Sequence, residues 1–147
     1  MNSEYKVFKF KSGNLDNFND HISIEEPVEI IIKYKDKEIW VEKTISVTMR
    51  TPGDDEDLVR GFLFNEKIIE KIDYIEKIEL TGKPTEQYGL KNKIIVTINN
   101  SDNIDVDKIK RNFLTNSSCG VCGKSSLDAL EIIKKDKILK SNPKISK

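Results

Sequence analysis

Apolar residues recur among lysines and glutamates along the first two thirds of the chain, in a pattern that predicts a small sheet. Residues 28–34 and 39–49 are rich in β-branched side chains and are separated by a polar turn, so they predict a hairpin. Residues 94–98 predict a later strand, and residues 68–80 fit a loop followed by a strand, although a helix also fits them. The core anchors expected in the hairpin are Trp40, Val41, Ile45 and Val47.

One helix is expected between these pairs of strands. Residues 51–53 break the second strand, and Asp54 precedes three further acidic residues. An aspartate caps free backbone N–H groups and acidic side chains suit the first turn of a helix, so a helix is predicted from Asp54 to about Asn65. Its apolar face is expected to come from the i,i+4 pairs Leu58 with Phe62 and Val59 with Leu63. The order ββαββ predicts an α+β body, a small mixed sheet of the β-grasp or roll kind packed on one helix.

The two ends of the chain carry weaker patterns. Residues 1–24 contain a strand-like piece at 6–11, a polar Asn-rich patch and His21, which is expected to be a surface residue. After the body, residues 105–114 predict a short helix, and a last helix is expected from Leu127, capped by Ser125 and Asp128. Three segments are therefore predicted: a lead-in (1–24), the body (25–114) and a final segment (115–147).

The composition of the chain argues against some classes of binding partner. The 147 residues are 37% hydrophobic and 34% charged, with 25 basic and 25 acidic side chains. This balance argues against nucleic acid and against an anionic membrane surface. There is no apolar run of about 18 residues and no signal-peptide layout at the N-terminus, so we expect a cytoplasmic protein without a membrane span. Cytoplasmic thiols are normally kept reduced.

Both cysteines of the chain, Cys119 and Cys122, lie in one glycine-containing loop. Such a pair serves as a redox disulfide, as half of a zinc site, or in nucleophilic sulfur chemistry. A redox disulfide is expected within a βαβ pattern, which is not evident here. A structural zinc ion needs four ligands, so no metal site is expected within one chain, although two chains could pool their ligands. A fourth interpretation is that two small side chains simply pack beneath a loop.

The residues around the cysteines favour reactivity. A helix N-terminus after the loop and the cation of Lys124 both lower the pKa of a nearby thiol and raise its thiolate fraction. Gly120 and Gly123 allow a tight bend that leaves the sulfur atoms uncovered. We therefore predict that Cys119 and Cys122 are the catalytic residues, supported by Gly120, Gly123, Lys124 and Ser125.

Two other motifs are weaker. The run Gly123-Lys124-Ser125 would fit a phosphate-binding P-loop only if a glycine stood at position 118, where the chain has serine. The acidic residues 54–57 could be read as a metal site, but a solvated first helical turn already accounts for them.

Three stretches together resemble the formate dehydrogenase accessory sulfurtransferase family, FdhD. They are Glu25-Glu26-Pro27, residues 48–58 followed by Gly61-Phe62-Leu63, and residues 117–126. The resemblance implies a sulfur relay, in which a cysteine desulfurase supplies sulfur as a cysteine persulfide. The acceptor is the molybdenum or tungsten bis-pterin guanine dinucleotide cofactor of a formate dehydrogenase, so no permanently bound cofactor is expected. Analogy with other Cys-x-x-Cys proteins favours Cys119 as carrier and Cys122 as helper, whereas proximity to the helix favours Cys122.

The chain departs from this family in length. Family members continue into a cytidine-deaminase-like domain associated with nucleotide-cofactor binding, and residues 115–147 would be only its beginning. We therefore expect a fragment, a split gene or a truncated product, in which the cofactor-binding residues are unknown. A homodimer or a second polypeptide could supply the missing half. The rival hypotheses are a non-catalytic docking module that shares zinc between two chains and an inactive fragment, so whether this chain alone is a sulfurtransferase stays open.

Overall fold

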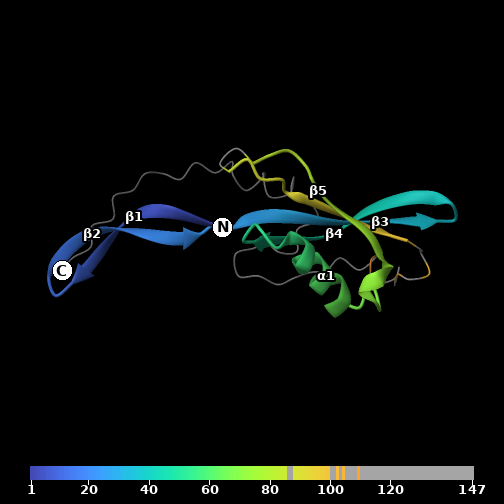
Figure 1. Cartoon of the computed structure of the whole chain (residues 1–147), viewed down its shortest axis with the longest axis horizontal. Coiled ribbons are helices and arrows are strands. Elements are labelled where there is room, and N and C mark those ends of the chain that lie inside the picture. Colours follow the sequence, from blue (N-terminus) through green and yellow to red (C-terminus); the bar gives the residue numbers. More distant parts are fainter. Residues whose placement is uncertain (86–87, 100–101, 103, 105–108, 110–147) are drawn as a thin grey trace, which may run out of the picture.

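The computed structural model describes residues 1–85, 88–99, 102, 104 and 109. These residues form two sheets, one α-helix and one 3-10 turn (Figure 1). In chain order the elements are β1 (Asn2–Lys11), β2 (Asn14–Ser23), β3 (Glu26–Asp36), β4 (Ile39–Arg50), α1 (Asp55–Asn65), the 3-10 turn (Ile72–Tyr74), β5 (Ile75–Thr81) and β6 (Lys93–Ile98).

The larger sheet confirms the predicted ββαββ order. Its strands lie in the order β4-β3-β6-β5. The β3–β4 and β5–β6 pairs are antiparallel, whereas β3 and β6 run parallel at the centre of the sheet. A parallel pair cannot be closed by a tight turn, and α1 lies in the long connection between these two strands. The result is a mixed sheet with one helix packed on it, as the sequence pattern predicted.

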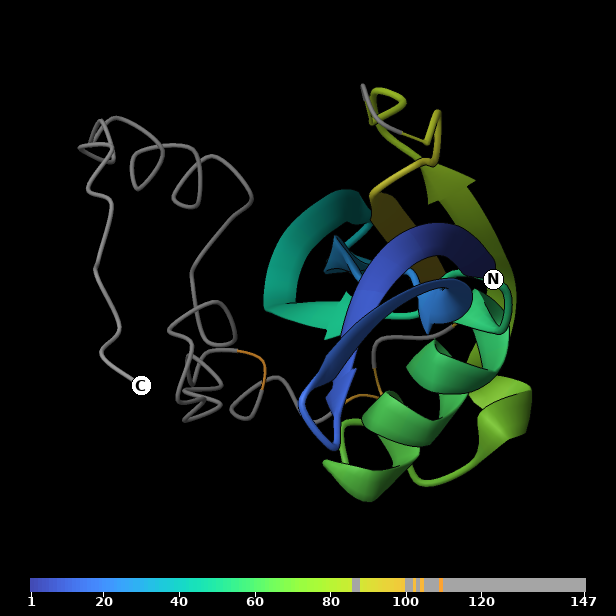
Figure 2. The same cartoon turned by 90° about the vertical axis from the view of Figure 1, so that its left-hand side faces the viewer.

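The helix packs on one face of this sheet (Figure 2). Alternate residues of β3 are buried, because successive side chains of a strand point to opposite faces. Val59 and Leu63 of α1 are fully buried in the same cluster, and their predicted partners Leu58 and Phe62 are half-buried at its edge. The strand residues of this core are Val28, Ile30, Ile32, Tyr34, Ile45, Ile94, Val96 and Ile98.

One predicted core anchor of the hairpin is wrong. Ile45 and Val47 are buried and Val41 is half-buried, but Trp40 is 48% exposed. Trp40 lies opposite Lys35, near the turn of the β3–β4 hairpin. The Nζ atoms of Lys33 and Lys35 lie 5.6 and 5.7 Å from its ring centre. The ring therefore makes cation–π contacts with two lysines and is not packed in the core.

The lead-in is more ordered than its composition predicted. The strand-like piece at 6–11 belongs to β1, and the polar Asn-rich patch is β2, which pairs with β1 over its whole length. Ser12 and Gly13 both have positive φ angles, 51° and 87°, as a two-residue type I′ hairpin turn requires. This β1–β2 arm extends away from the larger sheet (Figure 1), and His21 is exposed on it as expected.

Between α1 and β6 the loop-then-strand alternative is confirmed. The chain makes a 3-10 turn at Ile72–Tyr74 and then enters β5. Beyond β6 the structure describes only isolated residues, of which Ile104 and Ile109 are buried in the core cluster. The predicted short helix, the cysteine loop, the last helix and the segment boundary at residue 115 lie outside the described residues.

Candidate functional site

The six site residues predicted from the sequence lie outside the part of the chain that the structure describes. They are Cys119, Gly120, Cys122, Gly123, Lys124 and Ser125. Their roles therefore stay predictions. What the structure does place is the other distinctive block of the sequence, the turn that joins β4 to α1.

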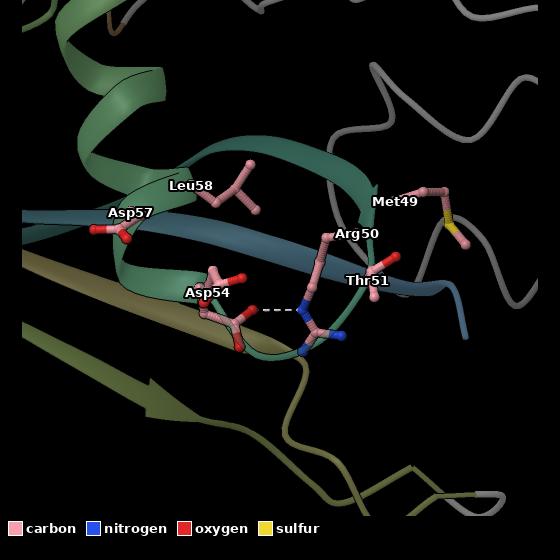
Figure 3. A pocket seen from close by; sticks show the side chains of 7 residues that line it. Met49, Arg50, Thr51, Asp54, Asp57 and Leu58 are labelled. Atoms are coloured by element: carbon pink, nitrogen blue, oxygen red, sulfur yellow. Dashed lines mark hydrogen bonds and ion pairs between the residues drawn. The ribbon is translucent and has the colours of Figure 1, made fainter. Parts of the chain in front are cut away.

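A buried arginine organises this turn. Arg50 is the last residue of β4, and its side chain is only 4% exposed. Its Nε donates a hydrogen bond to Oδ1 of Asp55 in the first turn of α1, and its Nη2 donates to the backbone oxygen of Lys91 over 3.0 Å. Figure 3 shows the side chain reaching from the strand toward the helix. Arg50 thus ties the sheet to the start of α1 and to the segment before β6.

The start of α1 differs from the prediction in one respect. Asp54 occupies the N-cap position, but its side chain makes no capping hydrogen bond. The backbone turns sharply just before it, at Gly53. The φ angle of Gly53 is 144°, which residues with a Cβ atom rarely adopt. The acidic first turn is confirmed, because Asp55, Glu56 and Asp57 occupy it. The capping role assigned to Asp54 is wrong.

A cavity of about 360 Å³ lies at this turn (Figure 3). Among its described lining residues, apolar side chains are combined with one guanidinium and three carboxylates, so the formal charge of these residues is negative. The lining residues are Met49, Arg50, Thr51, Asp54, Asp55, Asp57 and Leu58. Among the described residues, no group of three or more His, Cys, Asp or Glu side chains could hold a metal ion.

One donor of Arg50 lacks an acceptor. Within the described part of the chain, Nη1 is buried and makes no hydrogen bond. A buried donor without a partner costs about 1–3 kcal/mol, so this group is a candidate for contact with a ligand. Arg50 was not singled out from the sequence. The available signal was a single arginine at the end of an apolar strand, immediately before the Thr-Pro-Gly turn and the acidic run.

The buried carboxylate of Glu29 is structural. The side chain of Glu29 is 4% exposed and accepts a hydrogen bond from Oγ1 of Thr44 over 2.6 Å. The Nζ atom of Lys93 lies 2.9 Å from its second oxygen. These contacts join β3 to β4 and β6, so we assign Glu29 a structural role.

Tyr88 and Glu79, both outside the turn, have shifted pKa values. The hydroxyl groups of Tyr5 and Tyr88 lie 3.2 Å apart, and this hydrogen bond, with some burial, raises the pKa of Tyr88. A hydrogen bond from Lys77 lowers the pKa of Glu79 on β5. Neither side chain lines the cavity at Arg50. The two pKa shifts therefore reflect contacts of the arm and of the sheet surface, and not the chemistry of the cavity.

A family model described as the FdhD/NarQ family matches residues 23–147. The chain belongs to the FdhD/NarQ family. The match includes the turn at Arg50 and both cysteines, and it confirms the family resemblance seen in the three sequence stretches. It begins at the last residue of β2, so almost all of the β1–β2 arm precedes it.

Several curated relatives are named sulfur carrier protein FdhD. That of Sulfolobus acidocaldarius is 34% identical over 131 residues, which are 89% of this chain and 44% of the relative. That of Sulfurisphaera tokodaii is 35% identical and covers 88% and 44%, and that of Picrophilus torridus is 41% identical and covers 74% and 36%. The chain thus spans less than half the length of these relatives.

A solved structure from Desulfotalea psychrophila aligns with 66% of this chain and 34% of its own, with a TM-score of 0.49 and 24% sequence identity. Within the described residues, no helix has the length and apolar character needed to cross a membrane.

Proposed function

We propose that this FdhD/NarQ chain carries sulfur as a persulfide on Cys119, with Cys122 as its helper. The observation that carries the proposal is the position of the cysteines. The chain has only two, they are three residues apart, and both fall within the residues matched by the family model. The relatives that share this region are named sulfur carrier proteins.

The proposed chemistry is a sulfur exchange that needs no external oxidant or reductant. The thiolate of Cys119 attacks the outer sulfur of a donor persulfide, a new S–S bond forms and the donor leaves as a thiolate. Cys119 then holds the sulfur as Cys119–S–SH. In the next step a nucleophile attacks that outer sulfur, and the Cys119 thiolate is released. The thiol of Cys122 is three residues away and serves as the first acceptor or assists release.

The family resemblance supports the identity of donor and acceptor. We propose a cysteine desulfurase as donor and, as acceptor, the molybdenum or tungsten bis-pterin guanine dinucleotide cofactor of a formate dehydrogenase. In this scheme the cofactor is a client that receives sulfur and not a resident group. We also propose that a second copy of the chain or a second polypeptide takes part in delivery to the client.

Cyanolysis tests whether the chain carries transferable sulfur. The chain is incubated with a cysteine desulfurase and cysteine, separated from both, and treated with cyanide, which takes up the outer sulfur of a persulfide as thiocyanate. We expect close to one thiocyanate per chain, and none from the Cys119→Ala variant. A wild-type chain that releases no thiocyanate, after incubation with an active desulfurase, would overturn the proposal.

A further inference from the structure

We propose that the cavity between β4 and α1 is a docking site for a lysine or arginine side chain on an extended segment of a partner protein. The argument rests on the described residues that line the cavity, and neither proposed sulfur-carrying residue is among them. The inference is therefore independent of sulfur carriage, and a failed persulfide assay would leave it standing. Three properties of the lining lead to this class of ligand.

Charge is the first property. Among the described lining residues, Asp54, Asp55 and Asp57 oppose the cation of Arg50, so these residues together have a formal charge of −2. The carboxylate of Asp55 is already engaged by Arg50, which leaves Asp54 and Asp57 as the lining carboxylates outside that pair. An anion would be repelled here despite the nearby helix N-terminus, whereas a cationic side chain would be attracted.

The apolar part of the lining is the second property. It consists of Met49 at the end of β4 and Leu58 in the first turns of α1, which lie on either side of Arg50 in Figure 3. Lysine and arginine carry their charge on a chain of methylene groups, which can lie along an apolar surface while the charged end stays near water. A compact inorganic cation would leave these apolar side chains uncovered. The shape and chemistry of the lining therefore fit a long basic side chain better than a small ion.

The unsatisfied donor of Arg50 is the third property, and it points to a peptide. Nη1 is buried, has no acceptor among the described residues, and belongs to a side chain that lines the cavity. A backbone carbonyl oxygen of a bound segment would supply the missing acceptor without adding charge. Because Nη1 is enclosed, a neighbouring side chain must move before the segment can reach it.

A titration followed by NMR tests this proposal with the intact 147-residue chain. The probe is the blocked tripeptide acetyl-Ala-Lys-Ala-amide, compared with the same peptide carrying norleucine or glutamate in place of lysine. We expect saturable shifts of the backbone amides of residues 54–58 with the lysine peptide. The norleucine peptide should bind on the order of tenfold more weakly, because it loses a charged hydrogen bond. The glutamate peptide should not bind.

Two single substitutions provide the matched comparison. Asp54→Asn removes a lining carboxylate, and the helix should be preserved because the Asp54 side chain makes no capping hydrogen bond. Glu56→Gln removes one negative charge from the same turn, but Glu56 is paired with Arg60 and does not line this cavity. We expect Asp54→Asn to weaken binding about threefold and Glu56→Gln to leave it nearly unchanged.

Four results would overturn the proposal. They are equal binding of the lysine and norleucine peptides, equal losses from Asp54→Asn and Glu56→Gln, shifts caused by inorganic phosphate instead of the lysine peptide, and no saturable shift at peptide concentrations of about 10 mM.

Discussion

Arg50 and Asp55 form a buried ion pair that joins the last residue of β4 to the first turn of α1. Their side chains are 4% and 13% exposed. The pair closes the turn between the sheet and its only described helix, and it shapes one wall of the cavity at that turn.

Breaking this pair should destabilise the fold. In Asp55→Ala the buried guanidinium of Arg50 loses its counter-ion, and we expect unfolding in urea to show a loss of about 2–4 kcal/mol. Glu56→Ala is the control, because Glu56 is the next acidic residue of the same turn and its pair with Arg60 is exposed. That variant should lose less than about 1 kcal/mol. Equal losses in the two variants would contradict a special role for the buried pair.

Adjacent residues of α1 should differ sharply in their effect on stability. Leu63 is fully buried in the core, whereas Phe64 is 50% exposed. Truncation of a buried leucine removes its burial and leaves a cavity, so Leu63→Ala should cost about 2–5 kcal/mol in thermal or urea unfolding. Phe64→Ala should cost less than about 1 kcal/mol. A larger loss from Phe64→Ala would mean that α1 packs on the sheet with a different face.

The titration of Tyr88 should show whether the β1–β2 arm contacts the body of the protein in solution. Tyr5→Phe removes the hydroxyl group that bonds Tyr88, so the pKa of Tyr88 should fall toward its ordinary value. NMR of chains with ¹³C-labelled tyrosine rings can follow this group separately from the other three tyrosines. Because folding raises this pKa, the contribution to stability is present below the unfolded pKa and is lost as pH rises through the folded pKa. An unchanged Tyr88 titration in Tyr5→Phe would show that the arm does not make this contact in solution.

Metal analysis separates the persulfide proposal from the zinc-sharing hypothesis. Persulfide chemistry needs free thiolates, so purified wild-type chain should contain no stoichiometric zinc. If two chains pooled four thiolates on one ion, the chain would instead carry about half a zinc ion, and Cys122→Ser would lose it. That second result would favour a structural role for the cysteines.

Much of the body follows from local pattern. The strands β3, β4 and β6 and the helix α1 were predictable because their apolar residues recur with the period of one buried face. The arm was not, because β2 is rich in asparagine and aspartate, which are depleted in strands. Its structure depends on pairing with β1 across the Ser12-Gly13 turn, a feature of turn chemistry more than of hydrophobic pattern.

Tertiary context explains the remaining differences. Trp40 was expected in the core because of its side chain, but its position near the hairpin turn leaves it among lysines and solvent. The site at Arg50 was missed because one of its hydrogen bonds joins Arg50 to Lys91, which is 41 positions away. A local sequence pattern does not predict a contact between residues so far apart in the chain. The cysteine pair was recognised by its spacing alone, and its roles remain predictions.

The most direct test of sulfur carriage is the intact mass of the chain after incubation with a cysteine desulfurase and cysteine. We predict that the wild-type chain gains the mass of one sulfur atom, that Cys122→Ala keeps this gain, and that Cys119→Ala loses it. Formation of alanine from cysteine confirms that the desulfurase is active in each sample. A wild-type chain that stays at its original mass while alanine accumulates would contradict the account.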